Sequence, residues 1–285
     1  MSTFRAFGIP LTTIGRPIDP RVPTNRAILI LVASSFGFGS IAWGALGAPW
    51  SDALLRGLSL GGAVFFGWAL ARETDPDRAF SAFFAAVGAG AGAILLGNPH
   101  FLLLVWLLVA LRVIDRSTGA APGVLDWGAL YGLKLWLGFA AHWTIPLLTF
   151  PTLFFAGLNR LPRPLRVILP LVIPGAAVGY GIHHAWSFAP PLWGSVEVFV
   201  LAGVATGVIP VVASYRAVRS VGDRTGDPLV PHRVQWMLGW AAAAAITLTL
   251  SGTASLADIA PLWAALAGTT LGWVVDVTLR RRRAD

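Results

Sequence analysis

Seven of the 13 acidic residues of this chain fall in three short polar breaks between long apolar runs. They are Glu73, Asp75, Asp77, Asp115, Asp126, Asp223 and Asp227. Carboxylate oxygens are the protein ligands that Mg²⁺ takes, usually one or two of them together with substrate phosphates and waters. Arginines, which also occur in the breaks, can hold phosphate oxygens through paired hydrogen bonds. The three breaks therefore contain the residue types of a site for a lipid diphosphate.

Spacing within the breaks selects the candidate ligands. Asp75 and Asp77 flank a proline and can present both carboxylates to one cation. Asp223 and Asp227 stand four residues apart, which places them on one face if that loop is helical. We therefore predict that these four aspartates hold Mg²⁺. We predict that phosphate is bound by the arginine that directly follows an aspartate in each break, namely Arg78, Arg116 and Arg224.

The second and third breaks also share a short pattern, in which Asp-Arg is followed by Ser or Thr and then by a nearby Gly. The pattern starts at Asp115 and again at Asp223. It is consistent with a duplicated helix-pair unit, since repeats are common in membrane folds. It is also ordinary turn chemistry, because Asp and Thr accept backbone hydrogen bonds and Gly supplies positive φ. Arginines at such positions can simply anchor to lipid headgroups.

Composition sets the class of protein that must position these loops. Hydrophobic residues make up 56% of the 285 residues and charged residues only 12%, and there are 13 Trp and no Cys. Several charge-poor runs approach the roughly 20 residues that cross a bilayer, and strand-like alternation is absent. We predict an all-α, polytopic membrane protein with about 8–9 transmembrane helices. The expected helices are 27–47, 56–72, 79–97, 100–114, a broken stretch at 128–158, 167–186, 196–215, 235–251 and 258–279.

Arginine positions predict the orientation of these helices. If the stretch at 128–158 enters and returns, every arginine except Arg56 lies on the side of the N-terminus, as the positive-inside rule favours. A single crossing would conflict with that rule. Both termini are then cytoplasmic, and all three acidic breaks share their side. We expect a multi-pass protein of the cell inner membrane, with a polar arm (1–26), one transmembrane domain (27–279) and a basic tail (280–285).

The broken stretch supplies a second candidate site. Pro146 and Pro151 interrupt it, and proline breaks or kinks a helix. Broken helices are tolerated at membrane depth where they line a cavity, although two short tilted spans would fit equally well. Lys134 and His142 lie within the stretch and are predicted to line a cavity or pathway. Asp276 is either a partner for Lys134 or an ion-pair partner of Arg280 one turn later.

The first break and the third together resemble the intramembrane prenyltransferase superfamily. The resemblance rests on Glu73 to Arg78 after the second helix and on Gly222-Asp223-Arg224 with Gly226. It implies nine helices, two Asp-rich cytoplasmic loops and prenyl transfer from a diphosphate. The first break lacks the Asn-Asp start of that family.

Three classes of function are consistent with these features. The first is an intramembrane enzyme of lipid or isoprenoid diphosphate metabolism. The second is a transporter or flippase that uses 128–158 as its gate. The third is a non-catalytic subunit whose polar loops dock to other membrane subunits. The net charge of +8 suits anionic membrane lipids, and no nucleic-acid partner is expected.

Overall fold

The computed structural model describes residues 5–6, 9–10, 12–16, 18–140, 144–145, 147–149, 152, 179 and 194–284. The regular structure of these residues is helical, apart from an isolated bridge between Val221 and Pro228 and two antiparallel two-residue strands, β1 (Arg5–Ala6) and β2 (Ile9–Pro10). The predicted helical class is thus confirmed. The expected helix at 167–186 lies outside the described residues, apart from Gly179.

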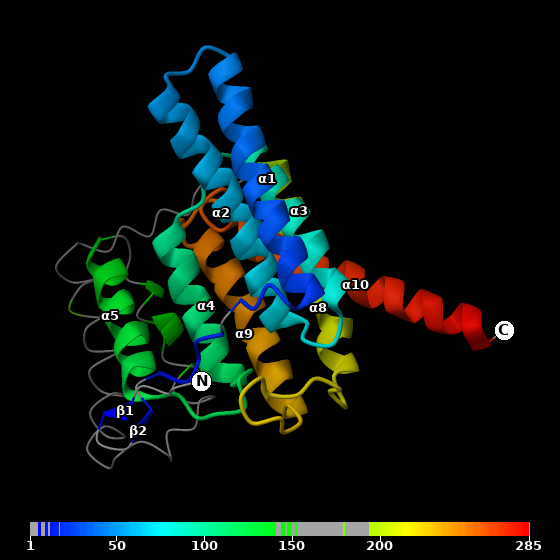
Figure 1. Cartoon of the computed structure of the whole chain (residues 1–285). Coiled ribbons are helices and arrows are strands. Elements are labelled where there is room, and N and C mark those ends of the chain that lie inside the picture. The colour runs from blue at the N-terminus through cyan, green and yellow to red at the C-terminus, as the bar shows by residue number, and fades with distance from the viewer. Residues whose placement is uncertain are drawn as a thin grey trace. The chain divides into compact units, whose positions relative to one another are not determined.

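The described helices follow the expected order (Figure 1). They are α1 (Pro23–Ala45), α2 (Trp50–Thr74), α3 (Ala79–Leu95), α4 (Phe101–Asp115), α5 (Val124–Ala140), α8 (Ser195–Ser214), α9 (Pro231–Leu250) and α10 (Ala260–Ala284). Proline opens α1 and α9, where its missing N–H costs no helical hydrogen bond. The helices α1, α3 and α9 each end one capping residue before a glycine of positive φ, a common way to stop a helix.

Four of the described helices are long and apolar enough to cross a membrane. They are α1, α2, α8 and α10 through Arg282, and α3 is a shorter apolar helix. Many outward residues along these helices are large and apolar: Phe38 on α1 and Phe199 on α8, for example, are largely exposed. An apolar surface of this kind suits lipid, not water, as its surroundings. These helices therefore indicate a membrane protein.

The chain divides into two compact units, each built from separate segments. The first, here the α2 unit, contains Pro17–Leu104, Gly194–Ser214 and Leu256–Asp285. The second, here the α9 unit, contains Met1–Arg16, Val105–Trp193 and Tyr215–Ser255. All four helices that are long enough to cross a membrane belong to the α2 unit.

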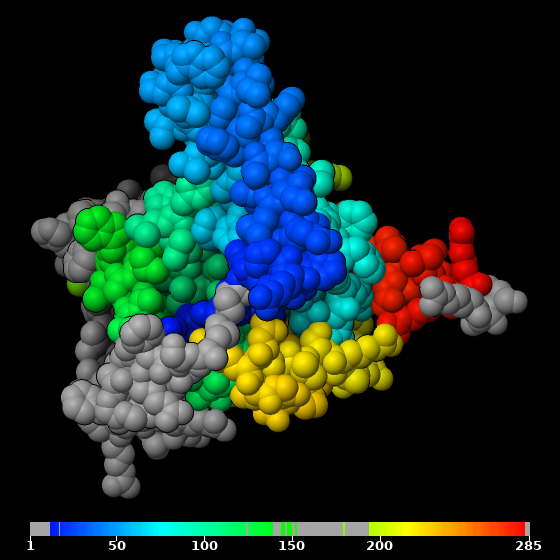
Figure 2. Space-filling model, viewed as in Figure 1, coloured from blue at the N-terminus to red at the C-terminus, as the bar shows by residue number. Residues whose placement is uncertain are grey.

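Small residues bring the helices of the α2 unit close together. Helix α2 packs against α1, α3 and α10, and α10 packs also against α3 and α8. A Cβ at Gly57 of α2 would lie only 2.6 Å from the Phe36 carbonyl oxygen of α1. A Cβ at Gly268 of α10 would lie 2.7 Å from the Ser81 carbonyl oxygen of α3. Close contacts of this kind replace the hydrophobic effect as a packing force within lipid. In Figure 2 the connected ends of α1 and α2, in blue, lie together at the top of the view.

The α9 unit is centred on aromatic and alanine side chains. Trp106 of α4 and Trp240 of α9 meet edge to face, with ring centroids 5.9 Å apart. The Trp240 indole donates a hydrogen bond of 3.0 Å to the carbonyl of Leu148. Thr144 and Thr253 share a hydrogen bond of 2.5 Å. Part of the predicted broken stretch is therefore attached to α9 and to the turn that follows it. Both prolines that interrupt the predicted stretch, Pro146 and Pro151, lie outside the described residues.

Candidate functional site

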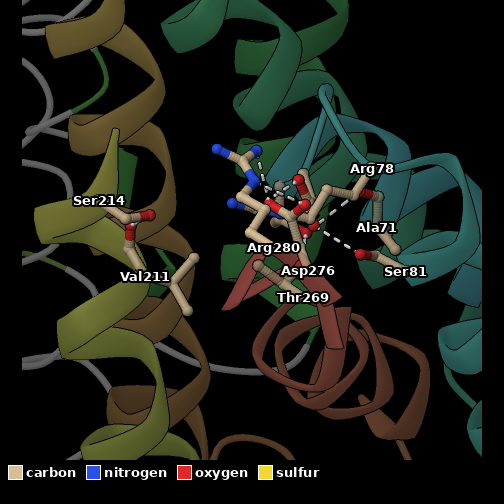
Figure 3. A network of polar contacts seen from close by, with 10 residues as sticks. Ala71, Arg78, Ser81, Val211, Ser214, Thr269, Asp276 and Arg280 are labelled. Carbon is tan, nitrogen blue, oxygen red and sulfur yellow. Dashed lines mark hydrogen bonds and ion pairs between the residues drawn. The ribbon is translucent and has the colours of Figure 1, made fainter. Parts of the chain in front are cut away.

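The first acidic break forms a polar cluster at the turn between α2 and α3, here called the Asp75 cluster (Figure 3). Helix α2 ends at Thr74, and Pro76 shortly afterwards prevents its continuation. Asp75 then accepts hydrogen bonds from Ser81 (2.5 Å) and from Arg78 (3.1 Å). The break therefore turns the chain back on itself through its own side chains.

Helix α10 completes this cluster from the far end of the sequence. Arg78 Nε donates to Asp276 Oδ2 over 3.2 Å, and Arg280 donates to the same carboxylate over 3.0 Å. In Figure 3 the side chains of Arg78, Asp276 and Arg280 converge on one point. The interpretation of Asp276 as the i+4 ion-pair partner of Arg280 is confirmed. Arg78 thus bridges two carboxylates, one of which is fully buried.

The contact between α3 and α10 depends on a glycine. A Cβ at Gly272 would lie 1.8 Å from Ser81 Oγ and 3.3 Å from Asp75 Oδ2. Only glycine leaves room for the hydrogen bond between Ser81 and Asp75. A further hydrogen bond of 2.8 Å joins Thr74 of α2 to Thr269 of α10. Three helices are therefore held together at this end of the α2 unit by buried polar contacts.

A second polar cluster lies in the α9 unit and surrounds Asp126, in the first turn of α5. Its carboxylate accepts hydrogen bonds from the Thr12 hydroxyl, the Thr13 amide (2.8 Å), the Thr13 hydroxyl (2.9 Å) and the Gly123 amide (2.7 Å). An acidic residue at this position accepts from the residue that caps the helix and complements its dipole. Asp126 therefore caps α5 and also fixes residues 12–16, which are part of the polar arm predicted at 1–26. These five residues are called the arm below.

Arginines attach the arm to the second and third breaks. Arg16 pairs with Asp223, and Arg224 donates to the Thr12 carbonyl over 3.0 Å. Arg112 donates to the Ile14 carbonyl over 3.3 Å. Residues 12–16 of the predicted polar arm are thus hydrogen-bonded to the second and third breaks.

The second and third breaks, which share a sequence pattern, pack directly against each other. The Arg224 amide donates to the Thr118 carbonyl over 3.1 Å. Gly119 has a φ of +82°, and a Cβ there would lie 2.0 Å from Thr225 Oγ1. The similar motifs are therefore contact partners, and Gly119 permits the approach.

The predicted metal ligands fall into both units. Asp75 and Asp77 belong to the α2 unit, where Asp75 is buried and Asp77 is partly exposed. Asp223 and Asp227 belong to the α9 unit and are exposed. Within the part of the chain that the structure describes, no group of three or more His, Asp or Glu side chains could hold a metal ion. Both oxygens of Asp75 accept hydrogen bonds from Ser81 and Arg78, so this carboxylate supports the fold.

The predicted phosphate and pathway residues also have defined places. Arg78 and Arg224 make the contacts described above, and Arg116 is buried with a φ of +56°. Lys134 is buried in α5, with its ammonium nitrogen 5.4 Å from the ring centroid of Tyr131, a cation–π geometry. His142 lies outside the described residues.

A cavity of about 440 Å³ lies within the α2 unit between α3, α8 and α10. One face of each helix contributes, including Gly92 on α3, Gly203 on α8 and Ala264 on α10. Trp263 closes part of the wall. Sequence reasoning missed this site, because close helix packing explains glycine-rich runs such as 88–92 equally well. Glycines at 88 and 92, four residues apart on one helix face, were the available signal.

Together, the apolar helices and the polar clusters at their ends define a helical membrane protein. No family model matches the chain, and it has no significant similarity to curated proteins or to solved structures. Its function must therefore be argued from the cavity and the clusters themselves.

Proposed function

We propose that the protein is a multi-pass protein of the cell inner membrane that binds a phosphorylated or diphosphate lipid. It acts in lipid or isoprenoid metabolism, by a reaction such as prenyl transfer. The observation that carries this proposal is the division of α10 into two parts. Its face from Ala260 to Leu271 lines the apolar cavity, and its last turns carry four consecutive arginines, Arg280 to Arg283.

The distance between the two parts fits an amphiphile. Arg280 lies nine positions after Leu271, which is about 14 Å along a helix at 1.5 Å per residue. Half of a hydrocarbon core of about 30 Å has nearly that thickness. A lipid whose tail lies in the cavity would therefore present its headgroup at the depth of the arginines. Arg281 and Arg282 are exposed there.

The contacts of the polar breaks support the proposed orientation, with both termini cytoplasmic and 8–9 spans in total. In the α9 unit, the arm is hydrogen-bonded to the second and third breaks. In the α2 unit, the first break is bonded to the end of α10. Each set contains only segments that the arginine count assigns to the cytoplasmic side.

The role of Mg²⁺ is a separate question from the binding of the lipid. The fixed hydrogen bonds of Asp75 do not fit a metal ligand, and Asp223 is paired with Arg16. We therefore assign no step of the reaction to a metal. Arginines are the residues that this proposal assigns to the phosphate.

Binding of radiolabelled farnesyl diphosphate to the protein in nanodiscs tests the proposal. The double variant Arg281→Gln/Arg282→Gln should weaken binding by about 2 kcal/mol, or roughly 30-fold, at about 1 kcal/mol per basic residue. Arg56→Gln is the matched control, because Arg56 lies in the first half of α2, away from the Asp75 cluster. Absence of saturable binding, or equal affinity in the double variant, would refute the proposal. Repeating the assay with EDTA tests the role of Mg²⁺ separately. Because no metal is assigned to the site, the affinity should not change.

A further inference from the structure

We propose that the cavity between α3, α8 and α10 is a binding site for one hydrocarbon chain, which enters sideways from the bilayer. The inference rests on the proposed function in one respect, since we identify the chain as the tail of the phosphorylated lipid. The cavity itself is argued from its walls, its opening and its size.

The cavity exists because side chains are missing where three helices meet. A Cβ at Gly92 would already lie 3.0 Å from the Ala260 Cβ, so α3 and α10 touch behind the cavity. A Cβ at Gly203, by contrast, would meet nothing within 4 Å. Gly203 of α8 therefore leaves a space that no neighbouring side chain fills. The volume of the whole cavity, about 440 Å³, falls within the usual range for a small-ligand site.

The walls are almost entirely apolar. Leu256, Ala264 and Trp263 supply carbon surface, and the hydroxyl of Thr270 donates to the Leu266 carbonyl of its own helix. Trp263 is 5% exposed, and its indole N–H has no hydrogen-bond partner among the described residues. This N–H is itself buried, so the surface that Trp263 adds to the cavity is apolar. A charged headgroup would find no compensating partners there, whereas a hydrocarbon chain would lose nothing.

The opening of the cavity indicates where its occupant comes from. Three residues that line it, Leu96, Phe199 and Leu271, are also exposed by 48%, 79% and 53%. They belong to the helices whose outward surfaces are apolar. A chain that entered between them would pass from bilayer hydrocarbon into the cavity without crossing a polar layer. The occupant is therefore a lipid chain rather than a water-soluble ligand.

Quenching of Trp263 fluorescence by brominated lipid chains tests this inference. The protein is reconstituted in vesicles of phosphatidylcholine with 9,10-dibromostearoyl chains, and the Trp263 contribution is taken as the difference between the wild type and Trp263→Phe. Because Trp263 is nearly buried and lines the cavity, a brominated chain in the cavity would lie directly against it. We expect this contribution to be quenched in the wild type.

Two leucine variants provide the decisive comparison. Gly203→Leu fills the cavity without a steric clash at Cβ, and should abolish the quenching of Trp263. Gly37→Leu adds the same side chain to α1 at a position that also has open space and does not line the cavity, and should leave the quenching unchanged. If Trp263→Phe does not fold, total quenching in the two leucine variants is compared directly, and Gly203→Leu must show less.

Unquenched Trp263, or equal quenching in both leucine variants, would overturn the inference. The test is independent of the proposed function. Quenching without farnesyl diphosphate binding would retain the cavity as a chain site and refute the phosphorylated-lipid function. Binding that depends on Arg281 and Arg282 without quenching of Trp263 would refute the cavity and retain the function.

Discussion

Replacement of Gly272 by alanine should disrupt the Asp75 cluster by a defined route. The new Cβ would lie 1.8 Å from Ser81 Oγ and 2.9 Å from Ser81 Cβ. Ser81 must then turn away and lose its 2.5 Å hydrogen bond to Asp75, which is fully buried. The substitution therefore acts on the turn between α2 and α3, although it is made on α10.

The size of the effect follows from two opposing contributions. A hydrogen bond to a charged group is worth about 1.5–3 kcal/mol. Alanine in place of glycine within a helix gains about 1 kcal/mol. The free energy of unfolding should therefore fall by about 0.5–2 kcal/mol in Gly272→Ala, while Gly37→Ala, which meets no neighbour, should be neutral or stabilising.

A double-mutant cycle with Ser81→Ala measures whether this route is correct. Unfolding is followed in detergent by the intrinsic fluorescence of the 13 Trp. In the Ser81→Ala background the hydrogen bond is already absent, so Gly272→Ala should cost less than in the wild type. The two substitutions should thus be non-additive by more than about 0.5 kcal/mol. Equal costs in the two backgrounds would refute the coupling through Asp75.

Two further predictions concern the α9 unit. Asp126→Ala should detach the arm and speed hydrogen exchange at the Thr13 amide by about 10- to 100-fold. This factor corresponds to the loss of about 1.5–3 kcal/mol for a charge-assisted hydrogen bond. An unchanged exchange rate would show that other contacts hold the arm. Gly119→Ala should destabilise the protein by about 1–3 kcal/mol, because φ is +82° and the Cβ would clash with Thr225. Gly128→Ala, at an open helical position, is its control in thermal unfolding, and equal midpoints would contradict the expectation.

The positions of the described helices were largely predictable from the sequence, because apolar runs end at proline, glycine or clustered charge. Helix α1 begins at Pro23 and stops before Gly47, close to the expected 27–47. The start of α2 was wrong by six residues, at Trp50 instead of 56. The expected helix thus left out Asp52 and began at Arg56. Asp52 instead stands in the first helical turn, where it complements the helix dipole, and Arg56 lies 5.6 Å from the ring of Trp43.

The partners of the charged side chains were not predictable from local spacing. The sequence singles out Asp75 and Asp77 as neighbours. In the structure, however, Arg78 joins Asp75 to Asp276, which lies 198 positions after Arg78. Asp126 likewise accepts from Thr13, which is 113 positions earlier. Which arginine or threonine reaches which carboxylate depends on how the helices pack. Charges at the edge of an apolar bundle need such partners, because an unpaired buried charge is strongly destabilising.

The glycines of the α2 unit show most clearly what a sequence pattern leaves open. Gly203 and Gly272 both lie within long apolar helices and are equivalent as sequence features. At Gly272 the space of the missing side chain is taken by Ser81, so this glycine serves packing and the Asp75 cluster. At Gly203 the space is left empty, and it opens into the cavity. Enlarging a packing glycine should therefore destabilise the protein. Enlarging a cavity glycine should instead displace the lipid chain and leave the stability of the protein unchanged. The helix bundle needs both kinds of glycine. A packing glycine holds the charged end of the bundle together, and a cavity glycine admits a hydrocarbon tail between the helices.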